Sequence, residues 1–234
     1  MTEAWTDPAL KAMRAACHTE DGPVLLALLR THEVSAVLQQ SGDALITAVC
    51  QGEPGARETA AEYTAALRER DWPGDEVLAA QLDTAVGGAV PALRVLHVDL
   101  EELSSLLEGD PAWGGGCLDL DTGACLPATL DAEELWDQEN DEAPERWLRV
   151  PSAGSRDAYH DMEHYIVTLD DRDFAGFLSI AIQGPGAFRR FKDMLATSPQ
   201  RQLRYWLFSA ERQRGRARAW LADHGYRPAR RGSP

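Results

Sequence analysis

Residues 114–130 of this 234-residue chain, GGGCLDLDTGACLPATL, decide its fold class. Apolar and polar side chains alternate in this stretch, so that Leu118 and Leu120 point to one side and Asp119 points to the other. A period of two is typical of a half-buried strand. The tripeptide Asp-Thr-Gly at 121–123 fits a three-residue hairpin loop with its glycine in the left-handed conformation. We therefore predict a β-hairpin here.

The segments that flank the hairpin predict further strands and a set of helices. Residues 93–98 alternate and include β-branched side chains, and residues 145–151 predict another strand. Asp99 begins a capping-box pattern for a short helix that ends at Leu107. The fold class is therefore α+β, with a small antiparallel sheet packed with C-terminal helices. Helices are expected at 155–169, 171–182, 187–196, 198–207 and 209–223, and another helix start at Asp131 to Glu134.

Residues 1–90 have only helical patterns, which glycine and proline interrupt at 42–43, 52–55 and 72–74. They predict a small all-helical bundle without a fixed repeat period. The run GGAVP at 87–91 is the expected linker. We predict three parts: a helical region at 1–90, an α+β domain at 91–228 and a disordered tail at 229–234.

The composition is that of a globular protein, with 44% hydrophobic and 26% charged residues. The longest apolar run, at 24–29, is far shorter than the ~20 residues of a membrane span, and no secretory signal is visible. We therefore expect a cytoplasmic protein without a membrane partner. The net charge of −15 is unevenly distributed, because residues 184–234 carry 12 basic and only 3 acidic side chains. This basic end leaves nucleic acid open as a partner.

The four cysteines, Cys17, Cys50, Cys117 and Cys125, have no spacing typical of a zinc site. In the predicted hairpin Cys125 lies opposite Asp119, which leaves Cys117 out of register for a cross-strand disulfide. We expect free thiols, as in a reducing compartment, and predict no metal site and no cofactor.

Two short motifs suggest enzymes, and for both we prefer a structural interpretation. LDTGA at 120–124 matches the active-site string of aspartic proteases, which need two such carboxylates on a largely β fold. Asp119 and Asp121 also have the spacing of haloacid-dehalogenase phosphatases, which need a parallel sheet. His160 and His164 fit the inverted zinc-protease motif, but helical spacing turns both imidazoles away from the predicted buried face. We therefore predict no catalytic residue.

An acidic run follows the hairpin. It lacks the glycine and the alternating ligands of a calcium-binding loop. We predict a solvated linker, or a surface that meets something basic, and the C-terminal end of this chain is itself basic. The run consists of Glu133, Glu134, Asp137, Glu139, Asp141, Glu142 and Glu145.

The stretch GPGAFRRFKDML, residues 184–195, places Arg189 and Arg190 in the first turn of a predicted helix. The helix dipole disfavours cations there by a few tenths to about 1 kcal/mol unless an anion compensates. The two glycines just upstream would let backbone amides approach such an anion closely. A phosphate, a nucleic-acid backbone or an internal carboxylate would each resolve the conflict, and the acidic surplus of the chain favours the internal carboxylate.

The last predicted helix is rich in arginine, and Gly215 within it indicates close approach of a neighbour. Trp206 and Trp220 occupy core-like positions, although aromatic residues interleaved with arginines also compose surfaces for single-stranded nucleic acid. We prefer core packing. The candidate anion- or partner-binding residues are Gly184, Gly186, Arg189, Arg190, Lys192, Arg212, Arg214, Arg216 and Arg218.

Several stretches together resemble one bacterial family. They are GPGAFRRFKD at 184–193, Trp206, the pair Trp220-Leu221, RWLRVP at 146–151, RDAYHDMEHYI at 156–166 and the hairpin from Cys117 to Leu126. They are similar to Uncharacterised Protein Family 0158, and the resemblance covers roughly residues 93–228. It leaves the N-terminal helical region outside and implies no established activity.

Our preferred hypothesis is a non-enzymatic interaction or regulatory module of unknown partner. Its basic C-terminal helices would dock on an acidic surface, either its own or that of a protein partner. The alternative is a nucleic-acid-binding protein that uses the arginine-rich helices, for which salt dependence would be steep. A third hypothesis is an enzyme that holds a phosphorylated substrate at the Gly184–Gly186 turn, although no general base or nucleophile has a recognisable spacing.

Overall fold

The computed structural model describes residues 2–89, 92–109, 115–128 and 145–229. The chain is mostly helical and carries a small three-stranded antiparallel sheet, so the predicted α+β class is confirmed. The helix start predicted at Asp131 to Glu134 lies outside the described residues. The acidic run also lies outside them, except for Glu145, and so does the predicted tail, except for Ala229.

The N-terminal bundle (helices α1 to α5 with the short 3-10 helix η1) forms the largest hydrophobic core. Side chains cap the first two helices, because Thr6 accepts a hydrogen bond from the Ala9 N–H and Asp21 accepts one from the Val24 N–H. The breaks predicted at 52–55 and 72–74 lie between helices, whereas Gly42 lies inside α3, so the break predicted at 42–43 is wrong. The helices are α1 (Asp7–Thr19), α2 (Gly22–Thr31), η1 (Val34–Ala36), α3 (Leu38–Gln51), α4 (Ala56–Arg70) and α5 (Asp75–Ala85).

The predicted hairpin is present as β2 (Gly116–Asp119) and β3 (Cys125–Pro127), and β4 (Trp147–Val150) pairs with the other edge of β2. The expected register is wrong by one residue, because the loop also includes Leu120 and the Asp119 N–H donates to the Ala124 carbonyl. Cys125 therefore lies opposite Leu118. Cys117 and Cys125, the pair for which a disulfide was considered, are free thiols.

The strand predicted at 93–98 forms, but it lies outside the antiparallel sheet. It is β1 (Arg94–Leu96), which pairs in parallel with β5 (Tyr226–Pro228) from the end of the chain. No strand was predicted at 226–228. Between β1 and the antiparallel sheet, α6 (Leu100–Leu107) begins at the predicted cap, where Asp99 accepts a hydrogen bond from the Glu101 N–H.

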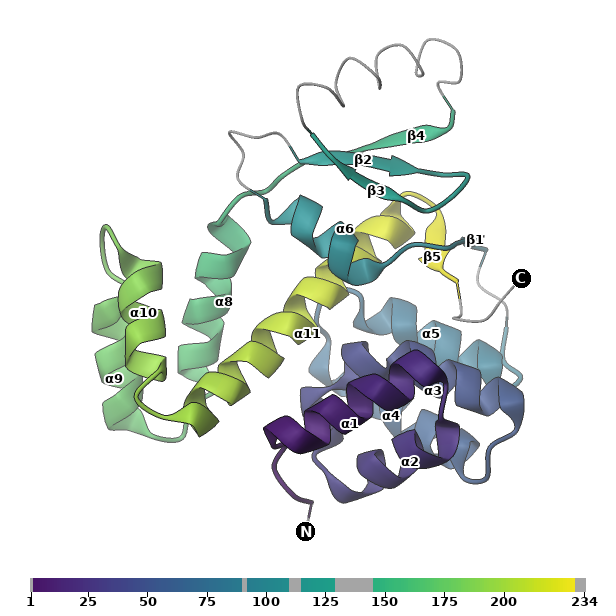
Figure 1. Cartoon of the computed structure of the whole chain (residues 1–234), viewed down its shortest axis with the longest axis horizontal. Coiled ribbons are helices and arrows are strands. Elements are labelled where there is room, and N and C mark those ends of the chain that lie inside the picture. The colour runs from purple at the N-terminus through teal and green to yellow at the C-terminus, as the bar shows by residue number, and fades with distance from the viewer. Residues whose placement is uncertain (1, 90–91, 110–114, 129–144, 230–234) are drawn as a thin grey trace.

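Three short helices form a helical lobe at one end of the molecule: α8 (Arg156–Val167), α9 (Arg172–Ala181) and α10 (Ala187–Leu195). Figure 1 shows this lobe standing apart from the N-terminal bundle. Aromatic rings fill its core, where Tyr165, Phe191 and Tyr205 meet edge to face.

The last helix, α11 (Pro199–Asp223), connects all parts of the fold. It is continuous over 25 residues, so the break predicted between 207 and 209 is wrong. It supplies Tyr205 to the core of the helical lobe, Leu207 to that of the N-terminal bundle and Leu221 to that beneath the sheet. Figure 1 shows α11 running from the lobe past the bundle to the strands. Its polar side chains must therefore enter these interfaces too.

Candidate functional site

The carboxylate of Glu211 on α11 caps the start of α3. It accepts hydrogen bonds from the backbone N–H groups of Gln39 at 2.7 Å and Gln40 at 2.9 Å. These are donors that a helix leaves unsatisfied in its first turn, and the N-cap residue Val37 offers no side-chain acceptor. Arg70 on α4 donates to the same carboxylate at 2.9 Å, and Glu211 is almost completely buried. The cap is therefore a charged one that joins α11 to the bundle.

Arg218, one of the predicted candidates, lies fully buried against the same bundle. Its guanidinium donates to Gln39 at 2.9 Å, to Gln81 at 3.0 Å and to Asp43 at 2.8 Å. Arg214 lies 3.6 Å from the same Asp43 carboxylate. Burial alone would raise the pKa of Asp43, but the two guanidinium groups hold this pKa below its ordinary value. Asp43 therefore stays ionised and serves two cations.

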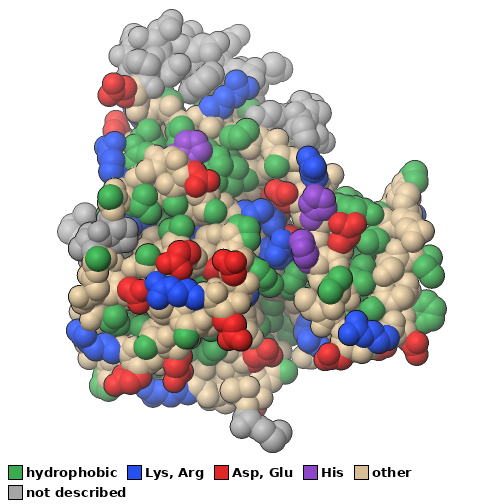
Figure 2. Space-filling model, turned by 180° about the vertical axis from the view of Figure 1, so that it is seen from behind, with side chains coloured by type: hydrophobic (Ala, Val, Ile, Leu, Met, Phe, Trp, Pro, Cys, Tyr) green, Lys and Arg blue, Asp and Glu red, His purple; other side chains and the backbone are tan. Residues whose placement is uncertain are grey.

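Arg212 and Arg216 converge on Asp161 of α8, whose side chain is fully buried. Arg216 binds both carboxylate oxygens, at 3.0 Å and 2.9 Å, and it also contacts Glu108 after the end of α6. Burial raises the pKa of Glu108 above its ordinary value, against the lowering effect of Arg216. Figure 2 shows cationic side chains deep in the hollow between the N-terminal bundle and the helical lobe, with histidines beside them.

Backbone carbonyl groups compensate the charge of Arg190 in the first turn of α10. Arg190 donates to the carbonyl oxygens of Ala181 at 2.9 Å and Gln183 at 2.6 Å, and it contacts that of Pro185. These carbonyls lie at the end of α9 and in the following loop, where a helix has a partial negative charge. Among the described residues, the compensating group for Arg190 is therefore not the expected carboxylate. It is the C-terminus of the preceding helix.

The remaining candidates around α10 lie at the surface and do not converge. Arg189 is 89% exposed and lies 3.8 Å from Asp193, the pairing that its helical spacing allows. Lys192 is exposed, and no described residue forms an ion pair with it. Gly184 and Gly186 both have left-handed backbones in the loop before α10. The structure therefore divides the predicted site residues between the arginines of α11, which are buried or half-buried, and an exposed set on α10 and in the loop before it.

Gly215 marks a close approach, as its position in the sequence indicated. A Cβ atom at this position would lie 2.3 Å from the carbonyl oxygen of Pro73. Gly74, which has φ +80°, faces it, because a Cβ there would lie 2.2 Å from the carbonyl oxygen of Gly215. Two glycines thus let the backbone of α11 touch the turn before α5.

Of the two enzyme-like motifs, the one around Asp119 forms an ion pair that stabilises the hairpin loop. Asp119 accepts two hydrogen bonds from Arg146, at 3.1 Å and 2.7 Å, and others from the loop that follows. Arg146 holds the pKa of Asp119 well below its ordinary range. His160 and His164 are exposed, as expected. Within the described ranges no three His, Cys, Asp or Glu side chains gather at a metal-binding distance.

The sequence analysis did not identify the carboxylates that accept the hydrogen bonds of these arginines. Asp43, Asp161 and Glu211 carry the ion pairs, and none of them was a candidate. For Asp161 a local signal existed, because it precedes the buried Tyr165 by one helical turn and so adjoins the apolar face of α8. Asp43 and Glu211 have partners far away in the sequence, which no local pattern reveals.

Comparison with known proteins then gives the family. Residues 117–233 match the model of the uncharacterised protein family UPF0158. The chain belongs to this family. A curated UPF0158 protein of Pseudomonas aeruginosa is 27% identical over 143 residues, which cover 61% of this chain and 92% of the relative. No solved structure matches the chain.

The match to UPF0158 starts inside β2 and includes the helical lobe and all of α11. The four candidate arginines of α11 therefore belong to the family segment (residues 117–233), whereas Asp43, Gln39 and Gln81 lie in the N-terminal bundle outside it. Arg212 pairs with Asp161 within the family segment. The buried ion pairs thus hold the family segment together and also attach the N-terminal bundle to it.

The helical lobe of this UPF0158 protein exposes large apolar side chains. Phe177 is 60% exposed and Ile180 is 67% exposed, and they lie one turn apart on α9. Figure 2 shows hydrophobic side chains along the edge that the lobe forms. Trp206 is 57% exposed, so its predicted core position is wrong. Its neighbours Tyr205 and Leu207 face two different cores, which leaves the residue between them toward solvent.

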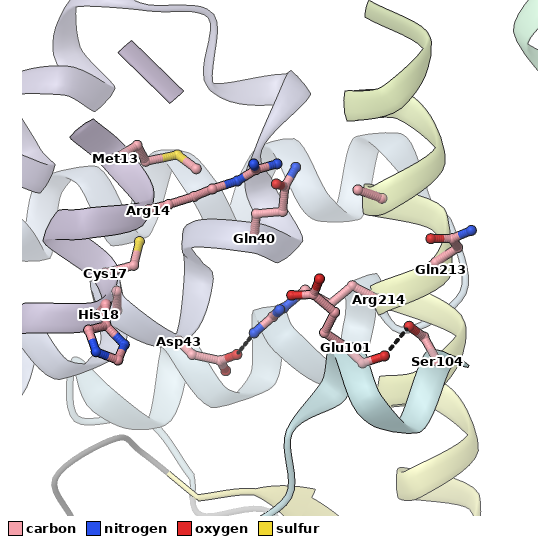
Figure 3. A pocket seen from close by; sticks show the side chains of 12 residues that line it. Met13, Arg14, Cys17, His18, Gln40, Asp43, Glu101, Ser104, Gln213 and Arg214 are labelled. Atoms are coloured by element: carbon pink, nitrogen blue, oxygen red, sulfur yellow. Dashed lines mark hydrogen bonds and ion pairs between the residues drawn. The ribbon is translucent and has the colours of Figure 1, made fainter. Parts of the chain in front are cut away.

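A cleft of about 400 Å³ lies between α1, α3, α6 and α11. Figure 3 shows Arg14 on α1 and Arg214 on α11 entering it from opposite walls, with Gln40 and Asp43 of α3 between them. Glu101 lies on the side of α6. The cleft is lined by charged and polar side chains, in contrast to the apolar face of α9.

None of the helices in the described part of the chain has the length and apolar character that a membrane span requires.

Proposed function

We propose that this UPF0158 protein is a non-enzymatic interaction module of the cytoplasm, and that its helical lobe binds a protein partner. The observation that carries the proposal is the exposed pair Phe177 and Ile180 on α9. Large apolar side chains that lie side by side on a surface helix are typical of protein contact sites. The free thiols of Cys117 and Cys125 agree with a reducing compartment.

The charges around this surface define the chemistry of the partner. Arg189 and Lys192 project into solvent from α10, which packs beside α9. The partner therefore presents apolar side chains flanked by acidic ones. In contrast, the cations of α11 face the carboxylates of the chain itself, which supports the part of the hypothesis in which the basic helices dock on their own acidic surface. Because these arginines already form ion pairs within the chain, few of them remain to bind the phosphate groups of a nucleic acid.

Capture from a lysate of the native host tests the proposal. The bait is the full chain, and it is compared with a Phe177→Ser/Ile180→Ser variant and with the control Val24→Ser. Val24 is likewise an exposed apolar residue, 44% exposed, but it lies on α2. We expect the same protein to be captured by the wild type and by the control, and to be lost from the double variant.

Circular dichroism must show that all three baits are folded. Equal capture by the double variant would contradict the proposed surface. Binding of labelled single-stranded DNA or RNA that falls steeply with salt and disappears in Arg189→Glu/Lys192→Glu would instead support the nucleic-acid alternative.

A further inference from the structure

Two arginines, Arg14 and Arg214, line the cleft between α1, α3, α6 and α11, together with the carboxylates Asp43 and Glu101. Asp43 is the shared acceptor of Arg218 at 2.8 Å and Arg214 at 3.6 Å, so one carboxylate faces two guanidinium groups. The shorter contact belongs to Arg218, which is fully buried and turned away from solvent. Arg214 is therefore the cation that lacks a full counter-charge.

Two further observations show that both arginines keep capacity to bind another group. The Nε atom of Arg214 is buried, and no described residue accepts a hydrogen bond from it. Across the cleft Arg14 is exposed, and no described carboxylate forms an ion pair with it. Arg14 and Arg214 face two carboxylates in the lining, Asp43 and Glu101, but Asp43 is shared with the buried Arg218. An exposed guanidinium group on one wall of the cavity and a guanidinium group with an unsatisfied donor on the opposite wall indicate an anionic ligand.

We propose that this cleft binds a small oxyanion ligand, a phosphate- or carboxylate-bearing metabolite, between Arg14 and Arg214. The volume of about 400 Å³ lies within the range of small-molecule sites. Planar guanidinium groups match the geometry of both oxyanions. Gln40 and Ser104 add polar groups for the rest of the ligand, and Glu101 would accept from a hydroxyl or ammonium group.

The position of the cleft gives the ligand a structural consequence. Arg14 belongs to α1 in the N-terminal bundle, and Arg214 belongs to α11 in the family segment. The two positively charged side chains repel each other across this boundary. An anion bound between them would attract both. The inference is independent of the proposed partner surface, because Phe177 and Ile180 lie on α9 and none of the residues that line the cleft belongs to the helical lobe.

Thermal unfolding of the full chain tests the site, with inorganic phosphate and malonate as probes and chloride at matched ionic strength as the reference. We expect a saturable rise in Tm with at least one probe, because a ligand that binds the folded state stabilises it. The more effective probe identifies the class of oxyanion. Arg14→Gln should reduce the apparent affinity at least tenfold, whereas the control Arg189→Gln, which removes another exposed arginine, should not change it.

Because Arg14 is exposed, its replacement leaves the core intact. Arg214→Lys provides a second variant that keeps the charge but loses the planar group, and we expect weaker binding in it as well. The absence of any saturable response, or an equal response of wild type and Arg14→Gln, would overturn the proposal.

Discussion

The carboxylate of Glu211 accepts a hydrogen bond from the backbone N–H of Gln39 at 2.7 Å, across 172 residues of sequence. A helix in the N-terminal bundle is thus capped by a side chain from the last helix of the chain. The contact is buried and is shared with Arg70, which in turn binds Asp75 at 2.8 Å. One charged network therefore runs from the C-terminal half of the fold into the N-terminal bundle.

Replacement of this carboxylate should be costly. In Glu211→Gln the side chain loses its charge and one acceptor, and Arg70 is left buried without its full counter-charge. We expect a loss of about 3–5 kcal/mol in the free energy of unfolding, as for other buried ion pairs from which one partner is removed. Urea denaturation followed by circular dichroism measures it. Glu163→Gln on the exposed side of α8 is the control and should change stability by less than about 0.5 kcal/mol.

Two glycines in helices should respond to alanine in opposite directions. Gly215→Ala places a methyl group against the Pro73 carbonyl, so we expect destabilisation by at least about 2 kcal/mol, despite the better helix propensity of alanine. Gly176 lies in α9 with no atom within 4 Å of an added Cβ. Gly176→Ala should therefore stabilise the protein by about 0.5–1 kcal/mol. Thermal unfolding distinguishes the two, and stabilisation by both would contradict the close contact of α11 with the turn before α5.

The pair Asp119–Arg146 predicts a pH dependence. Arg146 lowers the pKa of Asp119 in the folded state, so the pair stabilises the protein above the unfolded pKa of about 4, and the contribution is lost as the pH falls through the folded pKa. Arg146→Gln should cost about 1–2 kcal/mol at neutral pH. This difference should shrink in urea titrations below about pH 4. Arg149→Gln, an exposed neighbour on β4, should show no such trend.

The cysteines should differ in reactivity. Cys50 is exposed. Burial, together with the charges of Glu102 and Asp99, raises the pKa of Cys125 to about 12, which leaves very little thiolate at pH 8. Iodoacetamide labelling followed by peptide mass spectrometry should therefore modify Cys50 first and Cys125 last in the native protein. In urea the two should react at similar rates, and equal rates in the native protein would contradict the burial of Cys125.

The fold class and most element positions could be predicted, because they depend on local patterns. The alternation around Leu118 and the cap at Asp99 each specify a structure within a few residues. The parallel pairing of β1 with β5 could not be predicted in this way, since Arg94 and Tyr226 meet only through the tertiary fold. The continuity of α11 was missed for a similar reason, because its exposed and buried positions are set by three different cores.

The candidate site was predicted in part. The arginines stood out because cations are unexpected in the first turn of a helix and gather at the end of an acidic chain. In the structure Arg212, Arg214, Arg216 and Arg218 contact carboxylates of the chain itself. The partners themselves could not be identified, since a carboxylate such as Asp43 has nothing in its neighbouring sequence that predicts burial. Arg190 donates to backbone carbonyls at the C-terminal end of a helix. A search for charged side chains in the sequence does not find such a partner.

Native-state hydrogen exchange tests most directly the central claim, that the ion pairs of α11 fasten the N-terminal bundle and the family segment into one cooperative unit. The amides of α3 and α11 should open with the same free energy, and Glu211→Gln should lower both by the same amount. If α3 exchanges through a separate opening of lower free energy while α11 keeps its full protection, the two parts unfold independently and the claim is wrong.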